Sequence, residues 1–299
     1  NCKSRSANAP HIYAIADSTY QDALHHMIPQ NIILTGESNS GKTTNYLHLI
    51  EHLLYLGESM NISMNRIKNG IKLIHWLTQA ATPINQNSTR CTIRTEVIYG
   101  RTGKVSGCTF SIYQLEKLRV SQTDPTHSNF HIFYCIYDGL VKKGGAEKYH
   151  LSEGYKYKYL SDGVGFEHDN LNDKFKELER IFEEYEFSKE QIETIYTIIS
   201  AVLNIGEIKF KPSENDTAAI LNEDQVSKVA ALLQIDAKQL GWALVNYCYV
   251  SKGTAVSRHH TCDEAANARD VFANSLYARV VDYITSVINH KLSYGRAIL

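Results

Sequence analysis

Gly36-Glu37-Ser38-Asn39-Ser40-Gly41-Lys42-Thr43 is the stretch that decides the fold, because it has the glycine and lysine spacing of a phosphate-binding P-loop. Its glycines let the backbone fold round a phosphate chain and point N–H groups inward. The apolar run before it predicts a strand over residues 31–35, and the helical spacing after it predicts a helix over residues 43–56 that ends at Gly57. This order predicts phosphate binding; the alternative is a glycine-rich turn that arose by chance.

Two side chains of the loop have distinct expected roles. Lys42 would reach the β- and γ-phosphates of a nucleotide as a point charge. The Thr43 hydroxyl would take one coordination position on Mg²⁺, an ion that prefers oxygen ligands. The positive end of the following helix favours the same anion, so the loop and helix together predict a site for a phosphate chain with its metal.

Composition narrows the class of protein. Of the 299 residues, 43% are apolar, which is enough to fill a hydrophobic core. The 31 basic and 32 acidic residues nearly balance, so the net charge gives no reason to expect binding to nucleic acid or to an acidic membrane. The six cysteines form no C-x-x-C pair, and there is neither a signal peptide nor a long apolar span, so a reducing, cytoplasmic address is expected. The pairs His25-His26 and His259-His260 lack further ligands nearby and are expected to be surface histidines.

The first half of the chain alternates predicted helices and strands. A helix is expected over residues 18–27 and an amphipathic one over residues 67–81, stopped by Pro83. Residues 85–90 are polar and predict a loop, either a ligand-contact loop or an ordinary connection. Alternating residues 92–99 and 105–113 predict a β-hairpin.

The second half is expected to be mostly helical. One helix runs to about Leu140, residues 142–162 form a loop with at most short strands, and helices resume after Asn170. Capping boxes, Ser188 with Gln191 and Thr261 with Glu264, open helices that end near residues 204 and 291. Between them lie helices over residues 223–233 and 237–244 and a projecting hairpin or loop over residues 245–258.

Six segments in order resemble the myosin motor head. The P-loop is similar to its G-E-S-G-x-G-K-T, and residues 85–90 resemble its switch I, N-x-N-S-S-R. Residues 10–17, 115–120, 129–134 and 269–274 resemble its P-H-I-F-A-I-A-D, L-E-K-S-R-V, N-F-H-I-F-Y and R-D-A-L-A-K segments. The departures at Asn39-Ser40, Thr44, residues 88–92 and Leu118 look most like the class III myosins of insect photoreceptors.

The resemblance implies an α/β fold. A P-loop NTPase core, with a twisted mixed sheet flanked by helices, would cover about residues 1–135. A mostly helical upper actin-binding subdomain would cover about residues 136–299.

The resemblance also implies the site residues of a myosin-type ATPase that uses ATP and Mg²⁺. Asn85 and Ser88 would hold the γ-phosphate, Thr43 and Thr89 would ligate Mg²⁺, and Arg90 matches the arginine that pairs with a switch II glutamate. Thr254 sits where the family has an acidic or phosphorylatable residue on its actin-contacting loop. The residues implied to contact nucleotide are Gly36, Glu37, Ser38, Asn39, Ser40, Gly41, Lys42, Thr43 and Thr44.

The implied partners are an actin filament and, through a region outside this chain, calmodulin or a light chain; nucleic acid and direct membrane insertion are not expected. The chain looks cut from a larger protein, and residues 294–299 look like the lead-in to a switch II that the sequence does not contain. By itself this fragment is therefore expected to be inactive.

Two other functions stay open. A small-molecule P-loop kinase would need a lid rich in arginine, and residues 142–162 contain no arginine. A slow or inactive myosin that serves as a nucleotide-regulated actin tether stays open because Cys91-Thr92 replace the family's Phe-Gly after switch I and bear on how freely that segment moves.

Overall fold

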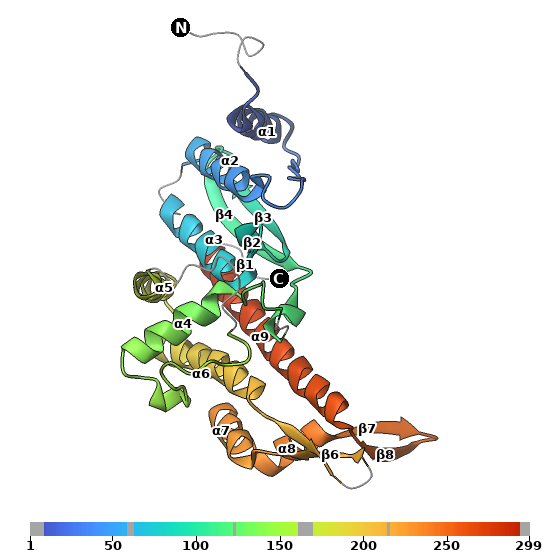
Figure 1. Cartoon of the computed structure of the whole chain (residues 1–299). Helices are drawn as coiled ribbons and strands as arrows, with labels where there is room; N and C mark the ends of the chain where they lie inside the picture. The colour runs from blue at the N-terminus through green and yellow to red at the C-terminus, as the bar shows by residue number, and fades with distance from the viewer. Residues whose placement is uncertain (1–8, 59–62, 122–123, 161–169, 214–215, 294–299) are drawn as a thin grey trace. The chain divides into compact units, whose positions relative to one another are not determined.

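The chain divides into two compact units of mixed helix and strand. The structure, a computed structural model, describes residues 9–58, 63–121, 124–160, 170–213 and 216–293 (Figure 1). The first unit holds the chain up to His75, Thr92–Tyr113 and the chain from Thr285. The second unit holds Trp76–Cys91 and Gln114–Ile284.

The first unit packs helices and one hairpin. Helix α1 packs on α2 through Ala16, Leu49 and Leu53, each less than 9% exposed, because these residues share the inner faces of the two helices. The hairpin strands pair antiparallel, as the alternation predicts. The elements are α1 (Ile12–His26), α2 (Lys42–Leu56), most of α3 (Met64–Thr78), β3 (Thr92–Tyr99) and β4 (Val105–Tyr113).

Gly57 follows α2, where the sequence predicts the helix end, and its N–H donates to the Leu53 carbonyl at 3.2 Å. Its φ of −101° is open to any residue, so backbone conformation does not require glycine here. Packing requires glycine here instead, since a Cβ at position 57 would lie 2.4 Å from the Tyr99 ring.

The predicted strand over residues 31–35 is wrong, because those residues form neither a strand nor a helix. Ile33 is 85% exposed, so the apolar run is not buried in a sheet interior. An extended segment becomes a strand only when a neighbour accepts its backbone hydrogen bonds, and none of the described strands pairs with it. Residues 10–17 also differ, since α1 begins at Ile12, before the expected start at Ser18.

The second unit is mostly helical, as predicted after Asn170. Figure 1 shows β7 and β8 as a two-stranded hairpin that projects near the start of α9. Its helices are α4 (His131–Lys142), α5 (Leu171–Glu184), α6 (Lys189–Gly206), α7 (Glu223–Leu233), α8 (Ala237–Val245) and most of α9 (Cys262–Leu292), with 3₁₀ turns η2 (Lys117–Val120) and η3 (Glu147–Tyr149). Its strands are β1 (Gln79–Thr82), β2 (Asn85–Thr89), β5 (Phe210–Pro212), β6 (Ala218–Ile220), β7 (Asn246–Ser251) and β8 (Thr254–His259).

The sheets differ from the expected twisted mixed sheet. The described strands form four antiparallel pairs, β1–β2, β3–β4, β5–β6 and β7–β8, each joining neighbours in sequence. The polar segment after Pro83 is strand β2 rather than a loop, because the helix before it ends at Thr78 and Gln79–Thr82 pairs with it as β1. The three-residue strands β5 and β6 were missed, since alternation is not detectable over so short a run.

Both capping boxes are confirmed. The Gln191 N–H donates to Ser188 Oγ at 3.1 Å, and the Ser188 N–H donates to the Gln191 side chain at 2.8 Å. The Thr261 N–H donates to Glu264 at 2.9 Å, and the Glu264 N–H donates to Thr261 Oγ1 at 3.3 Å. Residues 142–160 contain η3 and no strand, whereas the expected lead-in at residues 294–299 lies outside the described residues.

The core of the second unit contains an aromatic stack around Tyr277. Its ring stacks on Phe130 at 5.0 Å and on Phe133 at 4.9 Å, and its hydroxyl donates to the Leu77 carbonyl at 2.5 Å. Tyr277 is fully buried, so this hydrogen bond satisfies a group that would be costly to leave unpaired. The end of α3 is thereby fixed to α9 within this unit.

Candidate functional site

The P-loop of the first unit is an exposed turn that leads directly into α2. Gly41 is the residue before the helix and has φ 83°, and Gly36 has φ 149°, both in the region that favours glycine. The first N–H groups of α2 have no helical acceptor, because a helix leaves its first four donors unpaired. Donors and helix dipole together suit a phosphate chain.

Asn39 stands where the myosin pattern has glycine, and the structure explains why asparagine is accepted there. Its φ is 63°, a left-handed conformation that asparagine tolerates better than most residues with a side chain. At Gly36, a Cβ would lie 2.8 Å from Ser40 Oγ, so a side chain would fill the hollow of the loop. Asn39 therefore takes the left-handed conformation of this turn without a glycine.

Lys42 folds back over the loop. Its Nζ donates to the Gly36 carbonyl at 2.6 Å and to the Glu37 carbonyl at 2.5 Å, so the ammonium lies on the loop's own backbone. The Lys42 and Thr43 side chains are half-buried, at the first turn of α2. A cation and a hydroxyl beside unpaired backbone donors fit a nucleotide phosphate chain and its Mg²⁺.

The β1–β2 hairpin of the second unit presents the residues that resemble switch I. Ser88 is 5% exposed and pairs in register with Ala80 of β1. Thr89 Oγ1 accepts a hydrogen bond from Gln79 Nε2 at 3.2 Å. Asn85 Oδ1 accepts from the Asn87 N–H at 2.9 Å, so each expected residue here already has a local partner.

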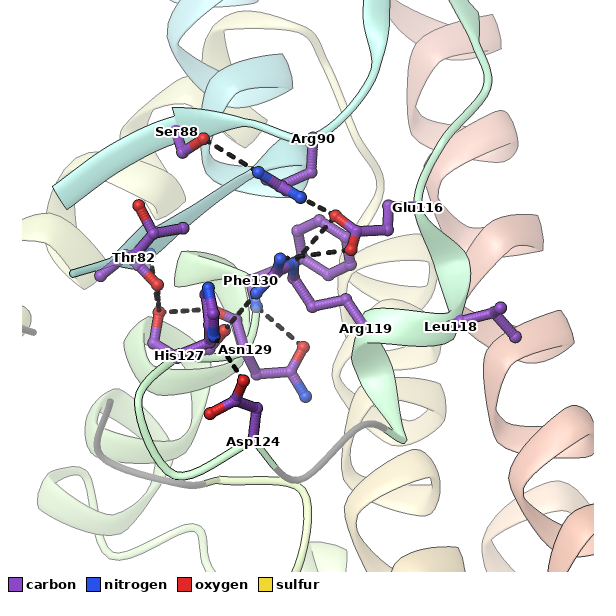
Figure 2. A network of polar contacts seen from close by, with 12 residues as sticks. Thr82, Ser88, Arg90, Glu116, Leu118, Arg119, Asp124, His127, Asn129 and Phe130 are labelled. Atoms are coloured by element: carbon purple, nitrogen blue, oxygen red, sulfur yellow. Dashed lines mark hydrogen bonds and ion pairs between the residues drawn. The ribbon is translucent and has the colours of Figure 1, made fainter. Parts of the chain in front are cut away.

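Arg90 follows β2 and is held by a carboxylate that sequence reasoning did not single out (Figure 2). Its Nε donates to Glu116 Oε2 at 2.5 Å, and its Nη1 donates to Ser88 Oγ at 3.2 Å. Arg119 holds the same carboxylate through Nε and Nη2, each at 3.2 Å. Burial alone would raise the pKa of Glu116, but hydrogen bonds and charge from the two arginines outweigh it and keep that pKa below its usual value.

Ser128 and Asn129 support this hairpin from the chain before α4. The Ala81 N–H donates to Ser128 Oγ at 2.7 Å, and the Ser128 N–H donates to the Ala81 carbonyl at 3.0 Å. Asn129 Nδ2 donates to the Val120 and Tyr159 carbonyls at 2.9 and 2.8 Å. Buried, fully used polar side chains of this kind give the hairpin a defined position in its unit.

Cys91 and His260 are both more enclosed than the sequence indicates. Burial raises the pKa of the Cys91 thiol to about 11, so it is protonated and a poor nucleophile near neutral pH. His260 is only 9% exposed, which corrects the expectation that both His259 and His260 lie on the surface. Its N–H donates to the Val245 carbonyl at 2.9 Å, and its ring lies 5.4 Å from that of Tyr247.

Thr254 opens strand β8 at the tip of the projecting hairpin. Lys252 and Gly253 form the two-residue turn with φ 50° and 80°, which is the left-handed pair that tight hairpins require. All residues of β8 are exposed, so the Thr254 hydroxyl is open to modification. In the described ranges, no helix has the length and apolarity to cross a membrane, and no cluster of three or more metal-binding side chains occurs.

Comparison with known proteins adds an independent finding. Residues 1–298 match the family model for the myosin head (motor domain). The Drosophila melanogaster protein named Neither inactivation nor afterpotential protein C is 42% identical over 99% of this chain and 20% of that protein. Myosin-IIIa of Homo sapiens is 35% identical over 97% of this chain and 19% of its own length. Unconventional myosin-Ic-A of Xenopus laevis is 29% identical over 96% of this chain and 28% of its own length. The chain therefore spans about a fifth to just over a quarter of the length of these relatives.

Proposed function

The chain belongs to the myosin head (motor domain) family, and from this premise we propose that it supplies the MgATP-binding and upper actin-binding portion of an ATP-driven actin motor. The observation that carries the proposal is the cradle of Gly36, Asn39 and Gly41, all at positive φ, at the N-terminus of α2. Motor activity belongs to the whole protein, of which this chain covers a part. A calmodulin or light-chain partner would bind elsewhere in that protein.

The proposed roles follow the residues. The backbone N–H groups of residues 36–44 and the Lys42 ammonium bind the phosphates, while Thr43 and Thr89 supply oxygen ligands to Mg²⁺. Asn85 and Ser88 act on the γ-phosphate, and Arg90 orients the segment that carries them. The metal, when bound, neutralises charge on the phosphates; the protein's part is to position them.

Lys42→Ala tests the nucleotide site in the whole head. The variant should weaken MgATP binding by about one to two decades, since a charge-assisted contact to phosphate contributes roughly 1.5–3 kcal/mol. Thermal stability should change little, because the described contacts of the side chain are to its own loop. Titration with a fluorescent nucleotide is the measurement, with the exposed Lys104→Ala as control; equal affinity in parent and Lys42→Ala would remove the P-loop from the proposal.

Thr254 is proposed as the regulatory position on the actin-binding hairpin. A phosphate on its exposed hydroxyl would add a charge of about −1.5 to −2 and strengthen contact with a basic spot on the filament. Thr254→Glu should bind actin about twofold to fivefold more tightly than Thr254→Ala in the presence of ATP, the range of an exposed ion pair. Co-sedimentation measures this, and equal binding would contradict the regulatory role.

The alternative function, a nucleotide-regulated actin tether, differs from the motor only in its rate of ATP hydrolysis. Cys91-Thr92 keep it open, because they replace Phe-Gly directly after the hairpin that carries Ser88. Steady-state actin-activated ATPase of the whole head separates the two functions: a motor is accelerated by actin, whereas a tether binds MgATP and actin without that acceleration.

A further inference from the structure

We propose that Glu116 is a positioning residue for ATP cleavage, because it fixes the Arg90 guanidinium and, through Arg90, the Ser88 hydroxyl. This inference rests on the proposed function and adds to it a residue outside the P-loop and switch I motifs. It follows from a closed ring of contacts in the second unit, and Figure 2 shows the part of it that runs from Ser88 through Arg90 and Glu116 to Arg119.

The carboxylate of Glu116 leaves the arginine little freedom. Arg90 donates Nε to Glu116 Oε2 at 2.5 Å while its Nη1 donates to Ser88 Oγ at 3.2 Å. A guanidinium is planar with its donors in a fixed fork, so holding one nitrogen on a carboxylate sets the direction of the others. The position of Glu116 therefore decides where Arg90 presents a donor to Ser88.

The main chain adds a second hold on the same residue. The Glu116 N–H donates to the Arg90 carbonyl at 3.0 Å, and the Arg90 N–H donates to the Thr78 carbonyl at 2.8 Å. The backbone of Arg90 is thus fixed on both sides, while its side chain is fixed by the carboxylate. A side-chain change at Glu116 leaves these backbone contacts intact and acts on the two guanidinium groups that share its carboxylate, those of Arg90 and Arg119.

Arg119 keeps Glu116 itself in place. Its side chain is 7% exposed, and besides Glu116 it binds the Ser128 carbonyl through Nη1 at 3.2 Å. Ser128 in turn pairs with Ala81 of β1, the strand that lies beside Ser88 in the hairpin. The contacts from Arg90 through Glu116, Arg119 and Ser128 thus return to the hairpin from which they start.

Stability alone is a weak explanation for the Arg90–Glu116 pair. Their side chains are 30% and 32% exposed, and ion pairs near water contribute little to folding. Displacing a group by about 1 Å, in contrast, can slow a reaction about a hundredfold. A positioning role therefore predicts a loss of cleavage rate without a matching loss of stability.

The test uses the whole head with Glu116→Gln, which keeps the size of the side chain and removes its charge. We expect the rate of the ATP cleavage burst to fall about 10- to 100-fold, with fluorescent-nucleotide affinity within threefold of the parent. The matched control is Glu179→Gln in the same unit, which breaks the 2.6 Å Lys143–Glu179 pair, since the Glu179 carboxylate is 30% exposed and that of Glu116 is 32% exposed. That control should leave cleavage and affinity unchanged.

A double variant asks whether Glu116 acts through Arg90. The double variant Arg90→Gln/Glu116→Gln should cleave ATP no more slowly than Arg90→Gln alone. Once Arg90 is replaced, the Glu116 carboxylate has no Arg90 guanidinium left to position, so its removal has no further effect on cleavage. Parental cleavage in Glu116→Gln, losses that add in the double variant, or affinity and thermal stability falling together with cleavage would each overturn the positioning role. A parent that does not cleave ATP would overturn the proposed function as well, which distinguishes the two failures.

Discussion

The P-loop and the β1–β2 hairpin carry the two halves of the expected nucleotide machinery, yet they are built in opposite ways. The P-loop is exposed, and Lys42 reaches carbonyls only five and six residues away. The hairpin is buried around Ser88 and takes its hydrogen bonds from partners up to 47 residues away, such as Ser128 to Ala81. The conformation of a motif can thus be set by contacts among its own residues or by contacts with residues distant in sequence. Substitutions in the two kinds of motif should therefore change the stability of the protein by different amounts.

The largest effect should come from a matched isosteric change in each region, Asn129→Asp and Asn39→Asp. The first turns a buried donor to two carbonyls into an acceptor, leaves the Val120 and Tyr159 oxygens unpaired, and should cost roughly 2–5 kcal/mol of folding free energy. The second lies on an exposed left-handed turn and should stay within about 0.5 kcal/mol of the parent. Denaturant unfolding of the two variants measures the difference, and equal stability would break the comparison.

A pH-dependent effect of intermediate size is expected beside the hairpin. Burial, with a smaller contribution from the charge of Lys174, lowers the pKa of His131 to about 4, although a hydrogen bond to the Gln86 backbone opposes the shift. The folded state therefore binds a proton on His131 less well than the unfolded state, in which the histidine pKa is about 6.5. The contribution of neutral His131 to the free energy of unfolding is complete above pH about 6.5. As the pH falls from 6.5 towards 4, this stabilisation is lost at up to about 1.4 kcal/mol per pH unit.

His131→Gln should therefore flatten the fall in unfolding free energy between pH 6.5 and 4, whereas the exposed His259→Gln should leave it unchanged. Denaturant unfolding at several pH values is the measurement. Parallel curves for parent and His131→Gln would contradict the assignment.

The smallest effect should come from the P-loop turn. Asn39→Ala should destabilise the loop by about 1 kcal/mol, since alanine gains nothing in the left-handed conformation, and Asn39→Gly should be neutral or slightly favourable. Hydrogen exchange of the Ser40 and Gly41 amides reports on this local equilibrium. If the change spread to amides of β2, the P-loop would not be the locally determined segment that we describe.

The same contrast explains how much of the fold the sequence could predict. Helix α7 was predicted with its observed ends and the β7–β8 hairpin within one residue of its own, because apolar spacing and a Lys-Gly turn are local signals. Strand β2 was mistaken for a loop, since Asn and Ser favour turns and only pairing with β1 makes the segment a strand. The strand expected over residues 31–35 failed for the converse reason: its composition is right, and it has no partner among the described strands.

The candidate site shows the same limit. Residues 36–43 and Arg90 were recognisable from motifs, and their assignment remains a proposal to be tested. Glu116 was not recognisable as a site residue, since its segment was noted only for its resemblance and nothing local indicates that its carboxylate meets Arg90, 26 residues away. Its i, i+3 neighbour Arg119 was the one available signal, and such pairs are common on surfaces.

The hydrogen bond from Tyr277 to Leu77 also sets an order of events during synthesis. It spans 200 residues, which a ribosome takes roughly 10–40 s to add. Residues 76–91 therefore leave the ribosome long before the aromatic ring that completes their packing, while α4 to α8 can fold in the interval. During that interval Leu77, which is fully buried in the finished unit, lacks the tyrosine that packs beside it and donates to its carbonyl, and it remains available to a chaperone.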